Sequence, residues 1–424
     1  MEVNKRLRVL VSAYACSPYK GSEPGVGWGY VKALSEYHDL WVIVEEEKCR
    51  EDIERYLEEN SQFASSVHFI FVRKQRNRLL RKIWPPSYYW YYRQWHREVL
   101  KLAQQLQQDL SFDLVHQLTM VGFREPGYLW KLDAPFVWGP VGGMGLFPWR
   151  FLPVVGVYGA CYYLGYNLYN LAQMRLLRRP KKAAIKAGRG LILATPENAS
   201  GAIKYWGVQG EVIPEIGLPE APAVEFSKRC EGEPLRIVWT GLHIPRKALN
   251  LALLALSRLP ESTNWELHVL GKGEQTEKWM RLSKTLGIGS HCTFHGWMPR
   301  EDALQVMKSA HVMLITSLRD LTSTVTVESL ALGLPVVTLD HCGFSSVVDQ
   351  SCGLKIPVTS PREVMQAVSE ALGSLEQDEG KRRSLASGAL LRASNFAWEG
   401  KAAQVDAIYR AKLKEVNQAR DYGC

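Results

Sequence analysis

Short apolar runs alternate with longer stretches of helical periodicity along most of the chain. The runs include residues 8–13, 40–45, 235–240, 312–316 and 335–339, and several are followed by turns rich in glycine, proline or hydroxyl side chains. Apolar runs of this length between helical segments are typical of buried parallel strands joined by crossover helices. The pattern therefore predicts an α/β chain built on parallel sheets.

The length of the chain favours more than one domain. Its 424 residues leave room for two or three domains, each with its own core. Hydrophobic residues make up 46% of the sequence and charged residues 22%, which excludes wholesale disorder. We expect a first domain over residues 1–217, a linker over residues 218–234, a second domain over residues 235–395 and a final helical segment over residues 396–424.

Charge and cysteine content narrow the class of partner. The net charge of +9 suits phosphorylated substrates or an anionic membrane surface, and it is too small to indicate nucleic-acid binding by itself. The eight cysteines form no Cys-x-x-Cys pair, so neither a zinc site nor a disulfide framework is predicted. We expect a protein of the reducing cytosol that binds no metal.

Residues 312–339 predict a strand, a polar loop, a helix over residues 324–332 and a second strand. Ser323 or Thr324 would cap the helix, and its free backbone N–H groups would favour an anion. Two acids, Asp320 and Glu328, lie in this unit with seven residues between them. Carboxylates beside an anion site are useful where they accept hydrogen bonds from sugar hydroxyls. The alternative is an acid that only stabilises its helix dipole, together with a loop aspartate in a turn.

The spacing of these acids resembles the signature of the nucleotide-sugar glycosyltransferases of family 4, group 1. That signature is Glu, seven residues, Glu, then a helix of small residues and Gly-x-Pro-Val. Here Asp320 replaces the first Glu, and Glu328 is followed by Ser-Leu-Ala-Leu-Gly-Leu-Pro-Val-Val. Val325 stands where the family usually has a hydroxyl side chain.

The resemblance implies the glycosyltransferase B-type fold, in which two Rossmann-like domains face a cleft and a C-terminal helix crosses back to the first domain. It also implies a retaining, metal-independent transfer from a nucleoside-diphosphate sugar, which is substrate rather than cofactor. Glu328 would hold the ribose, and Asp320 and His116 the sugar. The other residues that the resemblance places around the donor are Gly25, Gly27, Gly241, Gly296, Trp297, Ser323, Thr324 and Val325.

Arg246 and Lys247 stand next to each other at the predicted start of a helix, residues 248–259. Two cations at a helix N-terminus oppose the helix dipole, which makes a purely surface role unfavourable. A diphosphate would compensate both, Arg246 as a planar fork and Lys247 as a point charge. The pair matches the donor-phosphate pair of the family.

Two features of the first half fit the same site. His116 is predicted near the carboxyl end of a strand, where doubly wound sheets bind ligands, although a structural histidine is the alternative. Gly25 and Gly27 are predicted in the turn after the first strand, where small residues would let the backbone approach a diphosphate.

Residues 73–97 combine clustered cations with aromatic side chains. This mixture suits the headgroup layer of an anionic membrane. A helix with an aromatic core face and a solvated basic face is the alternative, and single-stranded nucleic acid would need similar chemistry. The candidate membrane or acceptor residues in this segment are Arg78, Arg81, Lys82, Trp84 and Trp90.

Residues 151–174 contain no charged side chain and are flanked by Arg150 and Arg175. The segment is long enough to span a bilayer, but its proline, glycines and tyrosines make it a poor spanning helix. We expect an interfacial or re-entrant insertion in which Tyr162 and Tyr163 face the membrane or the acceptor. A true span and a helix that covers the domain interface are the alternatives.

These features predict a hexosyltransferase that is cytoplasmic and peripherally bound to the inner leaflet of an anionic membrane. Its acceptor is expected to be lipid-linked, in envelope polysaccharide or glycolipid synthesis, and no nucleic-acid partner is expected. Two alternatives within enzymes are a soluble transferase with a small acceptor and a sugar-nucleotide epimerase. A non-catalytic membrane- or RNA-binding scaffold is the alternative from another class.

Overall fold

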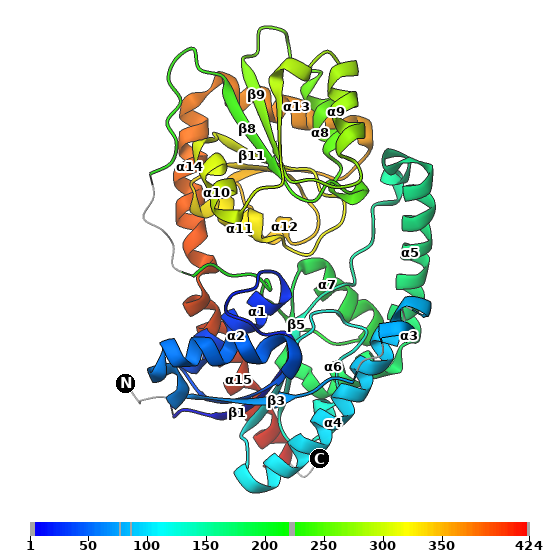
Figure 1. Ribbon diagram of the computed structural model, residues 1–424, viewed down its shortest axis with the longest axis vertical. Coiled ribbons are helices and arrows are strands. Elements are labelled where there is room, and N and C mark those ends of the chain that lie inside the picture. Colours follow the sequence, from blue (N-terminus) through cyan, green and yellow to red (C-terminus); the bar gives the residue numbers. More distant parts are fainter. Residues whose placement is uncertain (1–4, 76–77, 85–86, 220–224, 422–424) are drawn as a thin grey trace. The chain divides into compact units, whose positions relative to one another are not determined.

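The computed structural model describes residues 5–75, 78–84, 87–219 and 225–421, and it divides into two compact units (Figure 1). Unit 1 consists of Met1–Met144, Gln173–Pro219 and Trp398–Cys424, and unit 2 of Gly145–Ala172 and Glu220–Ala397. The uncharged insertion, which we had placed in the first domain, thus groups mainly with the second. Residues 220–224 of the predicted linker lie outside the described residues.

Unit 1 is built on a seven-stranded parallel sheet in the order β3-β2-β1-β4-β5-β6-β7. Its central strands consist almost entirely of buried side chains, as expected for a sheet covered by helices on both faces. The strands are β1 (Arg8–Ala13), β2 (Asp39–Glu45), β3 (Val67–Val72), β4 (Leu114–Thr119), β5 (Phe136–Val141), β6 (Leu191–Leu193) and β7 (Glu211–Val212).

The helices of unit 1 come from the three segments of the chain that form this unit. They are α1 (Glu23–Ser35), α2 (Glu46–Glu59), α3 (Arg78–Ile83), α4 (Ser87–Leu110), α6 (Arg178–Ala187), α7 (Pro196–Gly201) and α15 (Trp398–Asp421). Helix α15 packs against α1, and the Trp398 ring fills the space that Gly29 and Gly217 leave open. The C-terminal helix therefore returns to the first unit, as predicted.

Unit 2 is built on a six-stranded parallel sheet in the order β10-β9-β8-β11-β12-β13. The strands are β8 (Leu235–Thr240), β9 (Trp265–Leu270), β10 (Cys292–Gly296), β11 (Val312–Ile315), β12 (Val336–Leu339) and β13 (Gly353–Ile356). The helices are α8 (Leu249–Leu256), α9 (Thr276–Thr285), α10 (Arg300–Ser309), α11 (Thr324–Ala331), α12 (Phe344–Val347), α13 (Pro361–Gln377) and α14 (Glu379–Ala393).

The insertion forms a 3-10 helix, Trp149–Val155, followed by the long helix α5 (Gly156–Leu176). Phe147, Phe151 and Tyr163 belong to the hydrophobic core of unit 2. Asn167 holds the chain before the helix, because its amide accepts from the Phe147 N–H at 2.9 Å and donates to the Phe147 carbonyl at 2.8 Å. One side of α5 is therefore a packed part of unit 2.

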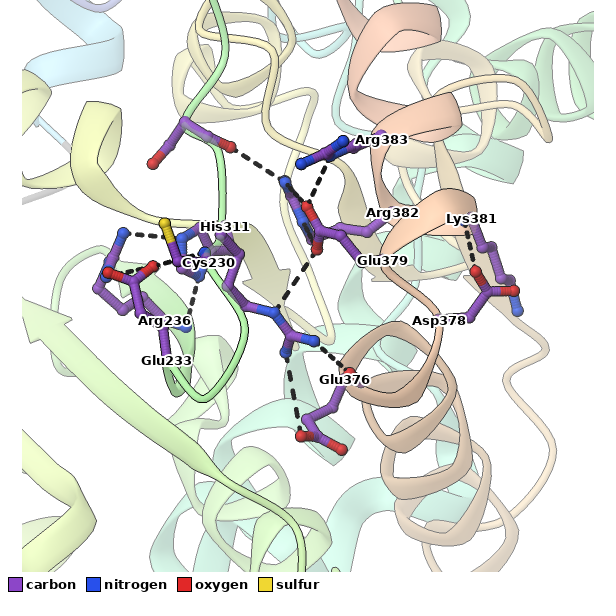
Figure 2. A network of polar contacts seen from close by, with 12 residues as sticks. Cys230, Glu233, Arg236, His311, Glu376, Asp378, Glu379, Lys381, Arg382 and Arg383 are labelled. Atoms are coloured by element: carbon purple, nitrogen blue, oxygen red, sulfur yellow. Dashed lines mark hydrogen bonds and ion pairs between the residues drawn. The ribbon is translucent and has the colours of Figure 1, made fainter.

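An ion-pair network fixes the segment that leads into β8 (Figure 2). Arg229 contacts Glu376 at 4.0 Å and Glu379 at 3.5 Å. The buried Arg382 pairs with Glu379 at 2.6 Å and donates to the Ser227 carbonyl at 3.0 Å. These contacts attach the start of unit 2 to the junction of α13 and α14.

The strand order places the predicted site. In unit 2 the order reverses between β8 and β11, which are neighbours in the sheet but distant in sequence. Ligands of doubly wound sheets bind outside the carboxyl ends of the strands at such a reversal. The loops that leave β8 and β11 there contain Arg246, Lys247 and Asp320.

Candidate functional site

Arg246 and Lys247 converge on Asp320. The Lys247 ammonium lies 2.5 Å from Asp320 Oδ2, and Arg246 Nη1 lies 3.4 Å from the same oxygen. Burial by itself would raise the pKa of the Asp320 carboxyl, but the two nearby cations outweigh it and lower that pKa. The structure thus holds two cations and one ionised carboxylate together at the switch point of the sheet.

Backbone contacts hold the two loops against each other. Arg246 Nη1 donates to the Arg319 carbonyl at 2.7 Å, and the Leu318 N–H donates to the Arg246 carbonyl at 2.8 Å. The Thr316 hydroxyl donates to the Lys247 carbonyl at 3.1 Å. Because each cation is tied to the loop that holds Asp320, the cluster is organised before any ligand binds.

The two cations precede helix α8 in a 3-10 turn, Pro245–Lys247, and Ala248 has a left-handed backbone with φ of 50°. The helix itself begins at Leu249, slightly later than predicted. Gly241 lies beside the Lys247 side chain, since a Cβ at Gly241 would be 3.6 Å from Lys247 Cε. The predicted glycine therefore borders the cation.

Helix α11 begins next to the cluster. Ser323, at the N-cap position, has φ of 69° and makes no side-chain capping hydrogen bond. Thr324 is exposed and Val325 is half-buried in the first turn. The N-terminus of α11 follows Asp320 directly in the loop, so its backbone N–H groups are candidates to receive an anion held by Arg246 and Lys247.

Glu328 lies on α11 and is almost buried. Its Oε1 accepts from Arg300 Nε at 2.9 Å and from Arg300 Nη2 at 2.6 Å. Both donors use one carboxylate oxygen. Arg300, whose side chain is 68% exposed, therefore holds Glu328 from the solvent side.

Gly296 is the last residue of β10, and Trp297 follows it in the turn. Gly296 has φ of 75°, a left-handed conformation that favours glycine, and its carbonyl accepts from the Gly271 N–H at 2.8 Å. The Trp297 ring is largely exposed. A large exposed indole on a turn in the same unit is available to a flat ligand group such as a base.

His116 has a structural position, which corrects the prediction that it reaches the sugar. It is the third residue of β4, fully buried, with Nε2 bonded to the Gly139 carbonyl at 2.8 Å and Nδ1 to the Tyr409 hydroxyl at 2.7 Å. Because a carbonyl only accepts, Nε2 carries the proton and Nδ1 accepts from Tyr409. Burial lowers the pKa of His116 to about 4, so the ring is neutral at pH 7.

Gly25 and Gly27 also differ from expectation, because they lie inside α1 rather than in a turn before it. A Cβ at Gly27 would lie 2.1 Å from the Ala15 carbonyl oxygen, and one at Gly25 would lie 2.7 Å from that of Lys20. Both glycines let the loop after β1 pack closely on the helix. In the structure both are packing positions at the start of α1, and their role in donor binding stays a prediction.

The candidate membrane residues differ in how exposed their side chains are. Lys82, Trp84 and Trp90 are exposed on or next to α3 and α4, whereas the side chains of Arg78 and Arg81 on α3 lie outside the described part of the chain. On α5, Tyr162 is 57% exposed.

Tyr163 is 6% exposed and stacks on Phe147 with ring centroids 4.3 Å apart. Its side chain is therefore core rather than membrane-facing, because the helical rotation from Tyr162 turns it inward. Within the described residues, no helix combines the length and the apolar character that a bilayer span requires.

Sequence reasoning missed Arg300 and Arg319. Arg300 begins α10, where a cation opposes the helix dipole, and this is the signal that pointed to Arg246 and Lys247. Arg319 directly precedes Asp320, and its carbonyl binds Arg246. The signal that could have indicated Arg319 is its position in the sequence, directly before the predicted site acid Asp320.

Comparison with known proteins identifies the domain that holds this cluster. Residues 225–390 match the model of the family described as glycosyl transferases group 1. This segment is similar to that family. The group 1 domain contains Arg246, Lys247, Asp320 and Glu328, and therefore the whole cation and carboxylate cluster described above.

A curated relative, the D-inositol 3-phosphate glycosyltransferase of Corynebacterium diphtheriae, is 25% identical over 252 residues, which are 54% of this chain and 58% of the relative. The chain spans about half the length of the curated relatives that it matches. The apo structure of the lipopolysaccharide outer core galactosyltransferase WaaB aligns with a TM-score of 0.62 at 14% identity, over 99% of this chain and 100% of WaaB.

Anabaena HepE in complex with UDP and glucose aligns with a TM-score of 0.55 at 15% identity, over 97% of this chain and 100% of HepE. At such identities these likenesses concern the fold. They confirm the predicted fold class, the glycosyltransferase B-type fold with two Rossmann-like sheets.

Proposed function

We propose that this chain is a retaining glycosyltransferase that moves a sugar from a nucleoside-diphosphate sugar to a lipid-linked acceptor, in the synthesis of cell-envelope polysaccharide or glycolipid. The observation that carries the proposal is the convergence of Arg246 and Lys247 at the switch point of the group 1 domain. WaaB, of the same fold, is named as a lipopolysaccharide galactosyltransferase, and HepE was solved with UDP and glucose.

In this proposal the cations stabilise the negative charge that grows on the leaving nucleoside diphosphate. Arg246 offers a planar fork and Lys247 a compact charge, and the N-terminus of α11 adds backbone donors. Such fixed charges lower the barrier without reorganisation during the reaction, so neither a metal nor a cofactor is required. The leaving phosphate deprotonates the acceptor, and no side chain is assigned as the general base.

The two carboxylates bind hydroxyl groups in this scheme. Asp320 pairs with both cations in the structure. When a diphosphate takes over part of that positive charge, one oxygen of Asp320 becomes available to the sugar. Glu328 receives Arg300 on Oε1 alone, which leaves Oε2 to accept from the ribose.

A membrane-bound acceptor is supported by the exposed surface of α5. The helix has no charged residue before Arg175, and its exposed large apolar side chains are Val157, Tyr158, Tyr162, Leu164, Leu168, Tyr169 and Leu176. No acid occurs between Asp133 and Glu197, whereas α6 begins with Arg-Arg-Pro-Lys-Lys. An uncharged helix with an exposed apolar face, followed by a basic helix, suits an anionic leaflet on the cytoplasmic side.

Donor binding is tested by thermal shift with UDP-, GDP- and ADP-sugars, on the wild type, Arg246→Ala and Glu328→Ala. A ligand at one hundred times its Kd stabilises a protein by about 2.7 kcal/mol, so a competent site gives a clear shift. Arg258→Ala and Glu370→Gln are matched controls, since both residues are exposed in unit 2 and neither contacts the cluster. Stabilisation of the wild type and the controls, lost in both site variants, supports the proposal.

Failure of every donor to stabilise the wild type would contradict the donor site and favour a non-catalytic scaffold. Conversion of the nucleotide-sugar without any acceptor would identify an epimerase instead. Transfer that is unaffected by chelation of divalent ions is expected, because the cations are side chains. The anomeric configuration of the product, measured by NMR, tests retention.

Membrane association is tested by flotation with vesicles of phosphatidylglycerol and phosphatidylcholine against vesicles of phosphatidylcholine alone. We expect flotation only with the anionic vesicles, and weaker flotation at high salt. Leu168→Glu should reduce it, because it places a charge in the apolar face of α5. Equal recovery of wild type and variant with anionic vesicles would remove α5 from the membrane contact and favour a soluble transferase.

A further inference from the structure

A side chain of helix α5 contacts the loop that leaves β11 and holds Asp320. The Tyr166 hydroxyl accepts a hydrogen bond from Arg319 Nη2, and the Arg319 guanidinium lies 3.8 Å from the centroid of the Tyr166 ring. Arg319 is thus held by a hydrogen bond and by a cation–π contact with the same residue. Both residues belong to unit 2 and both are half-buried.

Arg319 also belongs to the cation cluster. Its carbonyl accepts from Arg246 Nη1 at 2.7 Å, and its neighbour Asp320 pairs with Lys247 at 2.5 Å. A shift of the Arg319 backbone would therefore move the acceptor that orients the Arg246 guanidinium. Tyr166 contacts the side chain of this same residue from outside the loop.

The base of α5 is fixed well enough to act as a support. The Asn250 amide donates to the Val154 carbonyl at 3.0 Å, and the Tyr163 ring is packed on Phe147. Burial raises the pKa of the Tyr163 hydroxyl, and Arg246 and Arg319 oppose that rise. The inner face of α5 is therefore packed in unit 2, and Tyr166 contacts Arg319 from this helix.

We propose that Tyr166 is a positioning residue of the donor site, which orients Arg246 through Arg319 and makes the insertion helix α5 part of the diphosphate-binding apparatus. The inference rests on the proposed function, because the ligand of Arg246 is taken to be a nucleoside diphosphate. It assigns to the uncharged insertion a role that its apolar composition alone does not predict. In this proposal Tyr166 acts through Arg319 and not by direct contact with the donor.

The test measures the dissociation constant of UDP, and of GDP and ADP, by calorimetry for the full chain. Tyr166→Phe keeps the ring and removes the hydroxyl, so we expect UDP to bind about threefold to tenfold more weakly, an effect of about the size of one ordinary hydrogen bond. Tyr166→Leu removes the cation–π contact as well and should weaken UDP binding further. Tyr205→Phe is the matched control, because the Arg175 guanidinium also lies near its ring, at 5.8 Å, in unit 1.

A double-mutant cycle separates positioning from a general loss of stability. If Tyr166 acts through Arg246, the effect of Tyr166→Phe on UDP affinity disappears in the Arg246→Ala background. An unchanged UDP affinity in Tyr166→Phe, or an equal loss with and without Arg246, would overturn the inference. If the wild type binds none of the three diphosphates, the proposed function and this inference both fall.

Discussion

The Lys247 ammonium lies 2.5 Å from the carboxylate of Asp320, although the two residues are in loops that leave different strands of the sheet. In sequence they are separated by three strands, β9, β10 and β11, and by the helices α8, α9 and α10. The parallel order of β8 and β11 brings their carboxyl ends side by side, and the loops meet there. A bound diphosphate would therefore compete with the Asp320 carboxylate for the same two cations, Arg246 and Lys247.

Neutralising Asp320 should therefore separate diphosphate binding from transfer. In Asp320→Asn we expect UDP to bind about threefold to tenfold more tightly, since two cations lose their internal partner. Sugar transfer should fall at least about a hundredfold, because a transition-state contact to the sugar is lost. Calorimetry and a transfer assay measure the two effects. Asp340→Asn, which only breaks the pair with Lys355 at 3.3 Å, is the control, and weaker UDP binding in Asp320→Asn would contradict the competition.

Replacement of Glu328 should weaken the binding of a nucleotide but not the binding of pyrophosphate. If its carboxylate accepts from the ribose, Glu328→Gln should weaken UDP binding by about tenfold, as loss of a charge-assisted hydrogen bond implies. Pyrophosphate has no ribose, so its affinity should stay the same. Parallel calorimetric titrations with both ligands provide the comparison. An equal loss for both would show that Glu328 acts on the phosphates or on the fold.

The sheets could be predicted from the sequence because central strands such as β1, β11 and β12 are short buried apolar runs between turns. The polar loop after β11 also leads into a helix with a distinctive acid spacing. The cations at the start of α8 could be predicted as well, since charge against a helix dipole needs a partner. These features depend on local sequence and elementary electrostatics.

Features that depend on packing could not be predicted in the same way. The start of α1 was misplaced because its glycines resemble a turn, although Pro24 in the first helical turn was the correct signal. His116 was placed near the end of β4, but the strand continues to Thr119 and leaves the ring inside the sheet. The composition of an uncharged run such as α5 does not show which of its side chains face the core. Tyr163 is buried, whereas its neighbour Tyr162 is exposed to solvent.

The buried histidine of β4 makes stability depend on pH. The folded pKa of His116 is about 4, below its value of about 6.5 in the unfolded chain, so the unfolded state binds more protons as the pH falls through this window. Stability should be complete above about pH 6.5 and should decrease towards pH 4, by up to about 3 kcal/mol from this residue. His116→Gln should give a flatter profile.

Hydrogen exchange of peptides that cover β4, followed from pH 7.5 to pH 5 and corrected for intrinsic exchange, measures this dependence. The buried His96 has a pKa lowered to about 3 by burial and nearby cations. It affects the wild type and His116→Gln in the same way, so the difference between their pH profiles reports on His116. Equal slopes in wild type and His116→Gln would contradict the assignment. Loss of UDP binding at pH 7.5 in a folded His116→Gln would restore a role in the site.

The return of α15 to unit 1 depends on the space above Gly29. A Cβ at this position would lie 2.2 Å from the Trp398 ring, and such overpacking typically costs about 1–3 kcal/mol. Gly29→Ala, on α1, should therefore destabilise unit 1 and increase proteolysis of the C-terminal helix α15. Gly400 lies on α15 itself, and a Cβ there meets no atom within 4 Å. Gly400→Ala should therefore be neutral or stabilise by up to about 1 kcal/mol. Chemical denaturation and limited proteolysis of the two variants measure the contrast. If Gly29→Ala were as stable as Gly400→Ala, Trp398 would have room to move, and α15 would not be fixed to unit 1 by this contact.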